Sequence, residues 1–174
     1  WGYWVNRPYC IFHHSTSLRV RLNNPKASVS AFKGSYEYSI DSKGRISIPA
    51  KLRKYVSPEA NDSFTVTRCF EKCVYIYPQD ELVKLENSIR SLSPTDAEHR
   101  FFKRVLLQHA TDFQLDAQAR ITIPKELLQH AAIDGEVLIL GQFEHIEVWN
   151  PKEYKKYLDG QHKSYEDVAQ TVLQ

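Results

Sequence analysis

Apolar and polar residues alternate in several short segments of the chain, and this alternation is the period of a half-buried β-strand. Arg45-Ile-Ser-Ile48 is an example, because its two isoleucines would face inward while its arginine and serine face outward. Similar segments predict further strands over residues 35–40, 64–67, 74–77, 121–123, 136–140 and 146–149. The chain is therefore expected to be rich in short strands.

Between and after these strands, apolar residues recur at helical spacing. One stripe at i, i+3, i+7 and i+10 consists of Leu82, Leu85, Ile89 and Leu92. The segment Ser93-Pro-Thr-Asp96 should end that helix and cap a second one, whose stripe includes Phe101 to His109. Shorter helices are predicted over 50–55, 154–158 and 165–173.

An internal repeat is the most informative feature of the sequence. The segment Asp41-Ser-Lys-Gly-Arg-Ile-Ser-Ile-Pro-Ala-Lys-Leu52 recurs as Asp116-Ala-Gln-Ala-Arg-Ile-Thr-Ile-Pro-Lys-Glu-Leu127. Further along, Phe70-Glu71 matches Phe143-Glu144. Spaced recurrence of Asp, Arg, two Ile and Pro predicts two copies of one structural unit.

The repeat suggests a division of the chain into five parts. Residues 1–30 show no sustained period and are expected to form a poorly ordered N-terminal extension. The first repeat with its following helix would occupy 31–93, and 94–110 would be a linking helix. The second repeat would occupy 111–158, and 159–174 would form a C-terminal helix or tail. The expected fold class is α+β, dominated by strands.

Composition restricts the class of protein. A chain of 174 residues with 42% hydrophobic and 25% charged residues is typical of a globular protein. Apolar runs fall short of the roughly 18–20 residues that span a bilayer, and the N-terminus shows no secretory pattern. Three cysteines are too few and too odd in number for a disulfide scaffold, which favours a cytoplasmic location.

Charge is unevenly distributed although the net charge is only +2. Residues 1–33 contain basic but no acidic residues, so the remainder of the chain is slightly acidic. Such a body needs a concentrated positive face to bind nucleic acid. One candidate face lies in the first repeat and consists of Lys43, Arg45, Lys51, Arg53 and Lys54.

The repeated turn has a physical reason to hold its arginine in place. Asp41 can accept hydrogen bonds from backbone N–H groups further along the turn, and Gly44 permits a positive φ there. Pro49 should stop strand pairing and begin a short helix. Asp116 and Pro124 occupy the matching positions of the second repeat. Each turn would then present an arginine at the surface.

These side chains suit DNA contacts of two kinds. Arg45 is assigned to base contact or to combined base and phosphate contact, because guanidinium groups fork onto guanine edges, while Lys43, Lys51 and Arg53 would contact phosphates. Arg120 is the corresponding residue of the second repeat, where acidic neighbours weaken the case. The alternative is that each Asp-x-x-x-Arg pair is a structural ion pair and the cationic cluster merely a solvated face.

Catalytic and metal-binding patterns are weak. The chain has six glycines and no phosphate-cradling glycine-rich loop, and its histidines fit neither a nucleophile elbow nor zinc-helix spacing. Cys69 and Cys73 could suggest a metal, but no second Cys/His pair follows at suitable spacing. Structural or incidental cysteines are the favoured interpretation, and a metal site is the alternative. No enzyme activity, cofactor or metal is expected.

The sequence resembles the MraZ family. Residues 32–53 are similar to the beginning of MraZ proteins, 96–102 and 115–124 to their central helix and second repeat, and 134–141 and 146–151 to their end. The resemblance covers roughly residues 32–158. One departure is Ala119, where the second motif usually has glycine. If this position needs a positive φ, alanine costs about 1 kcal/mol there, or the turn adopts another shape.

The resemblance implies an AbrB-like swapped-hairpin β-barrel that both repeats complete within one chain. It also implies a ring-shaped homo-oligomer that binds promoter DNA of the bacterial division and cell-wall gene cluster and regulates its transcription. Its DNA-contacting motif maps onto Asp41, Lys43, Gly44 and Arg45, and onto Asp116 and Arg120.

Two kinds of expectation follow from this assignment, one about the DNA and one about location and partners, and one interpretation competes with it. Ring geometry would favour direct over inverted DNA repeats. The protein would be cytoplasmic and nucleoid-associated, without a membrane or a small-molecule substrate as partner. The competing interpretation is an AbrB-like protein-interaction module, antitoxin-like or scaffolding, that does not read DNA sequence.

Overall fold

Two copies of the same strand order build the protein, which is described here from a computed structural model over residues 29–173. The first copy consists of β1 (Phe32–Ser39), β2 (Arg45–Ser47), α1 (Ala50–Arg53), a 3-10 turn (Pro58–Ala60), β3 (Ser63–Arg68) and β4 (Cys73–Pro78), followed by α2 (Gln79–Arg90). After α3 (Ala97–Gln108), the second copy consists of β5 (Thr111–Gln114), β6 (Arg120–Thr122), α4 (Lys125–His130), β7 (Glu136–Phe143) and β8 (His145–Trp149). Helices α5 (Pro151–Asp159) and α6 (Tyr165–Val172) complete the described chain. Almost all of the expected N-terminal extension, 1–30, lies outside the described residues.

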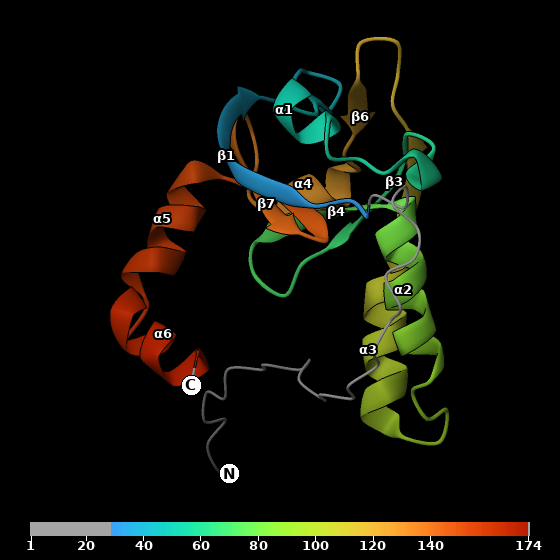
Figure 1. Cartoon of the computed structure of the whole chain (residues 1–174), viewed down its shortest axis with the longest axis vertical. Coiled ribbons are helices and arrows are strands. Elements are labelled where there is room, and N and C mark those ends of the chain that lie inside the picture. The colour runs from blue at the N-terminus through green and yellow to red at the C-terminus, as the bar shows by residue number, and fades with distance from the viewer. Residues whose placement is uncertain (1–28, 174) are drawn as a thin grey trace, which may run out of the picture.

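The two copies are interleaved rather than side by side. A six-stranded antiparallel sheet has the order β1-β7-β8-β4-β3-β5, and β2 pairs with β6 in a separate ribbon. The first strand of each repeat therefore pairs with the third strand of the other, β1 with β7 and β5 with β3. This exchange makes the fold the AbrB-like swapped-hairpin barrel that the family resemblance implied (Figure 1).

A hydrophobic core fills the space between the sheet and the β2–β6 ribbon. Ile46 and Ile121 pair directly at the centre of the ribbon, and both side chains are buried. Ile48 and Ile123 are buried as well, whereas Arg45 lies at the partly exposed outer face. The predicted alternation within 45–48 is thus confirmed. The sheet adds alternating residues that include Phe64, Val66, Val74, Ile76, Val137, Ile139, Ile146 and Val148.

Strand β5 was not predicted from the sequence. Its four residues, Thr111 to Gln114, include one apolar side chain, and three of the four are exposed. The strand pairs with β3 at the edge of the sheet, and the Oγ1 atom of Thr65 donates a hydrogen bond to the Asp112 carboxylate. Pairing with a distant strand, rather than a local pattern, fixes this segment as β.

The helices extend from the barrel as two arms. Helices α2 and α3 run antiparallel on one side, and α5 and α6 lie on the other (Figure 1). Asp96 caps α3 as predicted, since its Oδ1 atom accepts hydrogen bonds from the backbone N–H groups of Glu98 at 2.8 Å and His99 at 3.0 Å. Within the described residues, every helix is too short or too polar to cross a membrane.

Candidate nucleic-acid interface

The loop between β1 and β2 is held by one carboxylate. The Oδ1 atom of Asp41 accepts hydrogen bonds from the backbone N–H groups of Lys43 at 2.9 Å and Arg45 at 3.0 Å. The Oδ2 atom of Asp41 binds the Arg45 guanidinium, with Nε at 2.7 Å and Nη2 at 2.6 Å. These bonds, first the one from the Arg45 side chain, lower the pKa of Asp41 to about 2. The carboxylate is therefore ionised at neutral pH and orients the arginine.

The loop between β5 and β6 repeats this geometry. The Oδ1 atom of Asp116 accepts hydrogen bonds from the N–H groups of Gln118 at 2.8 Å and Arg120 at 2.9 Å. Its Oδ2 atom lies 2.8 Å from Nε and 2.7 Å from Nη2 of Arg120. The side-chain hydrogen bond from Arg120 is the main cause of the lowered pKa of Asp116. Both repeats thus build the same arginine-presenting turn.

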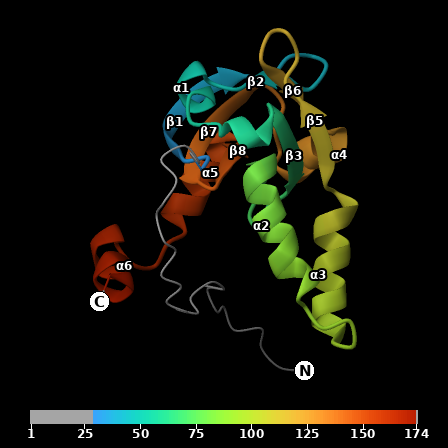
Figure 2. The same ribbon diagram turned by 45° about the vertical axis from the view of Figure 1, so that its right-hand side comes forward.

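The two loops belong to one surface at the end of the barrel away from α2 and α3 (Figure 2). The ribbon pairs Arg45 with Thr122 and Arg120 with Ser47, which places the two arginines on the same face. Reciprocal hydrogen bonds connect the loops, from Ile48 N–H to the Ala119 carbonyl at 3.0 Å and from Ile123 N–H to the Gly44 carbonyl at 2.8 Å. Sequence analysis missed this mutual support, because it depends on which strands pair.

Positive φ angles occur at the same position of both turns. Gly44 has φ +75° and Ala119 has φ +57°, so the second turn keeps its shape despite the departure from glycine. Alanine at this φ brings its Cβ close to the following carbonyl, at a cost of about 1–2 kcal/mol. The second turn is therefore the more strained of the two.

Exchanging these residues should change stability in opposite directions. Gly44→Ala is expected to lower the free energy of unfolding by about 1–2 kcal/mol, since its Cβ would also lie 3.0 Å from the Ile123 carbonyl oxygen. Ala119→Gly is expected to raise it by about 0.5 kcal/mol, because relief of strain exceeds the added unfolded-state entropy. Urea unfolding followed by circular dichroism measures both. If both variants changed the free energy of unfolding in the same direction, the result would contradict a strained second turn.

Both arginines are half-buried and ion-paired. The Arg45 side chain is 29% exposed and that of Arg120 is 24% exposed. The structural ion pair considered from the sequence is thus present in both loops. Each side chain nevertheless keeps part of its surface exposed, and pairing leaves the guanidinium few orientations. An arginine fixed in this way can meet a planar ligand with little loss of side-chain entropy.

The first repeat supplies further cations, one in its loop and three after its ribbon strand. The side chains of Lys43, Lys51, Arg53 and Lys54 are exposed. Arg53 reaches back to the ribbon, where its Nε donates a hydrogen bond to the Ile48 carbonyl at 3.2 Å. In the second repeat, the corresponding region offers Lys125 beside the exposed Glu126. The first repeat thus supplies most of the cations, but the antiparallel ribbon divides them between the turns, because Ile48, which binds Arg53, also donates its N–H to the Ala119 carbonyl of the second loop.

A proline positions the short helix that follows each ribbon strand. Pro49 and Pro124 are the N-cap residues of α1 and α4. The Pro49 carbonyl accepts hydrogen bonds from the N–H groups of Leu52 at 2.9 Å and Arg53 at 3.0 Å. The predicted change from strand to helix at these prolines is confirmed, and it places Lys51 and Arg53 directly after β2.

Comparison with known proteins gives a consistent result. A family described as "MraZ protein, putative antitoxin-like" matches the chain twice, over residues 31–105 and 106–174. Three similar proteins are each named Transcriptional regulator MraZ. The one from Halothermothrix orenii is 41% identical over 79% of this chain and 94% of its own length. Those from Natranaerobius thermophilus and Syntrophomonas wolfei are 35% and 37% identical, each over 82% of this chain and 96% of its own length. The chain belongs to the MraZ family.

Proposed function

We propose that this protein is a sequence-specific DNA-binding transcriptional regulator. The observation that carries the proposal is the pair of Asp–Arg turns on one surface, together with the exposed cations that the first repeat supplies. The names of its relatives support the same role. The proposed role is non-enzymatic and is exercised at the nucleoid in the cytoplasm.

The cations would make two kinds of contact with DNA, to base edges and to phosphates. Arg45 would contact base edges, because its guanidinium is already oriented by Asp41 before DNA arrives. Lys43, Lys51 and Arg53 would contact phosphates, since exposed side chains can follow the irregular backbone. Arg120 would add a weaker second contact, because the second repeat supplies fewer cations and holds this arginine in the more strained turn.

The regulated genes and the assembly are part of the proposal. Following the family resemblance, we infer that the target is promoter DNA of the division and cell-wall gene cluster. We further infer that several copies form a ring that presents first-repeat loops along one rim. Loops that point the same way would contact direct repeats about one helical turn apart. Footprints centred on inverted repeats would argue against this arrangement.

A protein-interaction module is the second candidate, and the "antitoxin-like" family description favours it. Salt dependence separates the two. Binding through phosphates releases counterions, so the affinity should fall steeply with salt, by about 10³–10⁵-fold between 50 and 200 mM if 6–10 phosphates are contacted. A protein partner held by apolar contacts would respond far less.

Fluorescence anisotropy with the DNA upstream of the protein's own gene provides the test. We expect tight binding at low salt and a linear fall of the logarithm of affinity with the logarithm of salt concentration. A scrambled duplex of the same length is the control and should bind more weakly. Equal affinity for both duplexes, or no binding at low salt, would refute sequence-specific regulation.

A further inference from the structure

Two cysteines and a glutamate meet at the tip of the β3–β4 hairpin. The last pair of the ladder is Arg68 with Val74, so Cys69 and Cys73 lie opposite each other where the turn begins. Glu71 is the central residue of this turn. Its Oε2 atom lies 3.0 Å from the Cys69 Sγ atom, and the two sulfurs and a Glu71 oxygen all lie within 4.8 Å of one another.

We propose that this cluster binds a thiophilic divalent cation of the zinc type, with Cys69, Cys73 and Glu71 as ligands. Zinc prefers thiolate and carboxylate ligands at about 2.0–2.3 Å, so three atoms this close need only small side-chain rotations to surround one ion. Three protein ligands leave the fourth position for water. Because Glu71 is only half-buried, solvent can reach this side of the cluster.

The surroundings of the two sulfurs suit a cation. Both thiols are buried, and the basic residue of the turn, Lys72, is exposed and pairs with Glu153 at 3.5 Å instead of lying against them. Metal binding requires the thiols to lose their protons, so the affinity for the ion should rise with pH.

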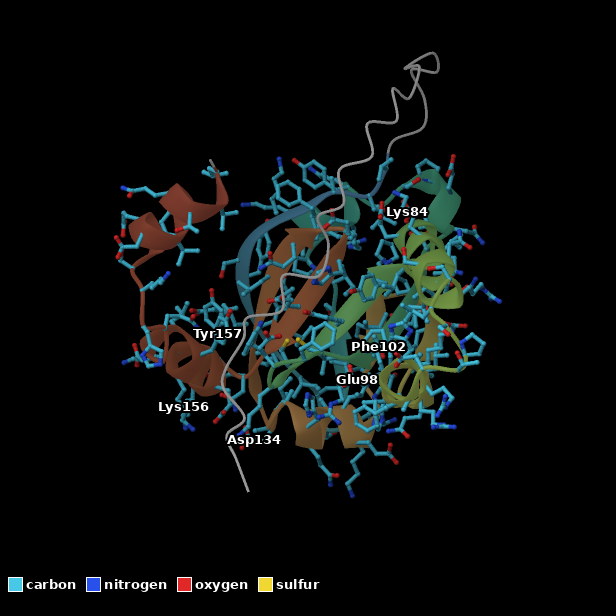
Figure 3. The ribbon with its side chains drawn as sticks, turned by 90° about the horizontal axis from the view of Figure 1, so that it is seen from below. Lys84, Glu98, Phe102, Asp134, Lys156 and Tyr157 are labelled. Atoms are coloured by element: carbon cyan, nitrogen blue, oxygen red, sulfur yellow. The ribbon has the colours of Figure 1, made fainter. Side chains whose placement is uncertain are left out.

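The cluster lies on the face of the sheet between the two helical arms. Figure 3 shows this underside, with Phe102 of α3 on one side and Tyr157 of α5 on the other. Phe70 in the turn stacks on Phe102 with ring centroids 6.1 Å apart. This face is opposite the loops that carry the proposed DNA contacts, so the metal proposal does not depend on the proposed function.

A purely structural turn accounts for only part of this arrangement. The Glu71 N–H donates to the Cys69 sulfur at 3.3 Å, which closes the turn without a metal. Turn formation does not require the Glu71 carboxylate to fold back onto the same sulfur. The turn also contacts the second repeat, since the His130 Nε2 atom lies 2.8 Å from the Glu71 carbonyl oxygen. A metal would therefore hold a point where the two repeats meet.

Cobalt(II) provides a spectroscopic probe of the site. The full chain with Cys10→Ser, kept under a metal-free reductant, is titrated with Co²⁺. We expect a thiolate-to-cobalt charge-transfer band that saturates at one equivalent and disappears on addition of Zn²⁺. Cys69→Ser or Cys73→Ser should abolish saturable binding at this stoichiometry. Glu71→Gln should weaken binding at least about tenfold, the smallest loss expected when even an outer-shell partner is removed.

Glu144→Gln is the matched control, because Glu144 occupies the corresponding position of the second repeat, next to His145 rather than between two cysteines. It should bind Co²⁺ like the parent chain. A parent chain that is folded by circular dichroism and shows no charge-transfer band would overturn the proposal. So would a band that Glu71→Gln and Glu144→Gln leave equally strong, since Glu71 would then not be a ligand.

Discussion

Replacing Arg45 with alanine is expected to reduce affinity for the target DNA by about 1–3 kcal/mol for each loop that contacts the duplex. The reason is that Arg45 combines a direction fixed by Asp41 with the fork geometry that suits guanine. In a ring with several loops engaged, the losses would combine and specific binding would fall below detection. Gel shifts on the upstream DNA, wild type beside variant, measure the effect.

Arg45→Lys separates base reading from charge. Lysine keeps the positive charge but loses the two-pronged donor, so affinity for unrelated DNA should persist while discrimination between target and scrambled duplexes falls. Arg120→Ala should have the smaller effect, because the turn that presents Arg120 is the more strained one. This ordering of the three variants tests the asymmetry between the repeats.

Arg90→Ala is the matched control for a general effect of charge removal. Arg90 also belongs to an i,i+4 ion pair, with Glu86 at 3.5 Å, but it is exposed on α2 in the helical arm. Its removal should leave DNA binding close to wild type. Folding of each variant is checked by thermal unfolding, because Arg45 also supports its turn. A folded Arg45→Ala protein with wild-type binding would refute the assignment of this site.

Separating the repeats is expected to abolish the fold. A fragment of residues 29–93 contains β1 without β7 and β3 without β5, and its β2 lacks β6. Buried residues such as Ile46, which pairs with Ile121, would become exposed. The fragment retains one internal strand pair, β3 with β4, and an isolated hairpin is at best marginally stable in water.

Amide dispersion in NMR spectra and circular dichroism measure the outcome. The fragment of residues 29–93 should be unfolded as a monomer, and mixing it with residues 94–174 should restore a folded one-to-one complex. Self-association of one fragment would be consistent with the exchange, since a second copy could supply the missing strands. A folded monomeric fragment would contradict the interleaved topology.

Local features of both turns could be predicted from the sequence. Three such features depend only on neighbouring residues, and the structure agrees with each. They are the alternation around Ile46 and Ile48, the change from strand to helix at Pro49, and the positive φ that the turn requires at Ala119. Strand β5 depends on a partner far away in the chain, so its polar residues gave no local signal. The Glu71 carboxylate carries no recognisable ligand pattern in the sequence, because two cysteines are usually completed by a second Cys/His pair and not by a residue between them. The contacts of the cations with DNA remain a proposal.

The two interleaved halves are joined in one chain, and this connection gives the surface that carries the two turns a direction. A homodimer of single repeats would carry identical turns on both sides of its axis, and its binding surface would read the same in either orientation. Within one chain, the turn at Gly44 is relaxed and the turn at Ala119 is strained, and the first repeat supplies most of the cations. If the proposed DNA contact is made, the two ends of the surface would therefore bind unequally, and the protein would distinguish the two directions along a double helix.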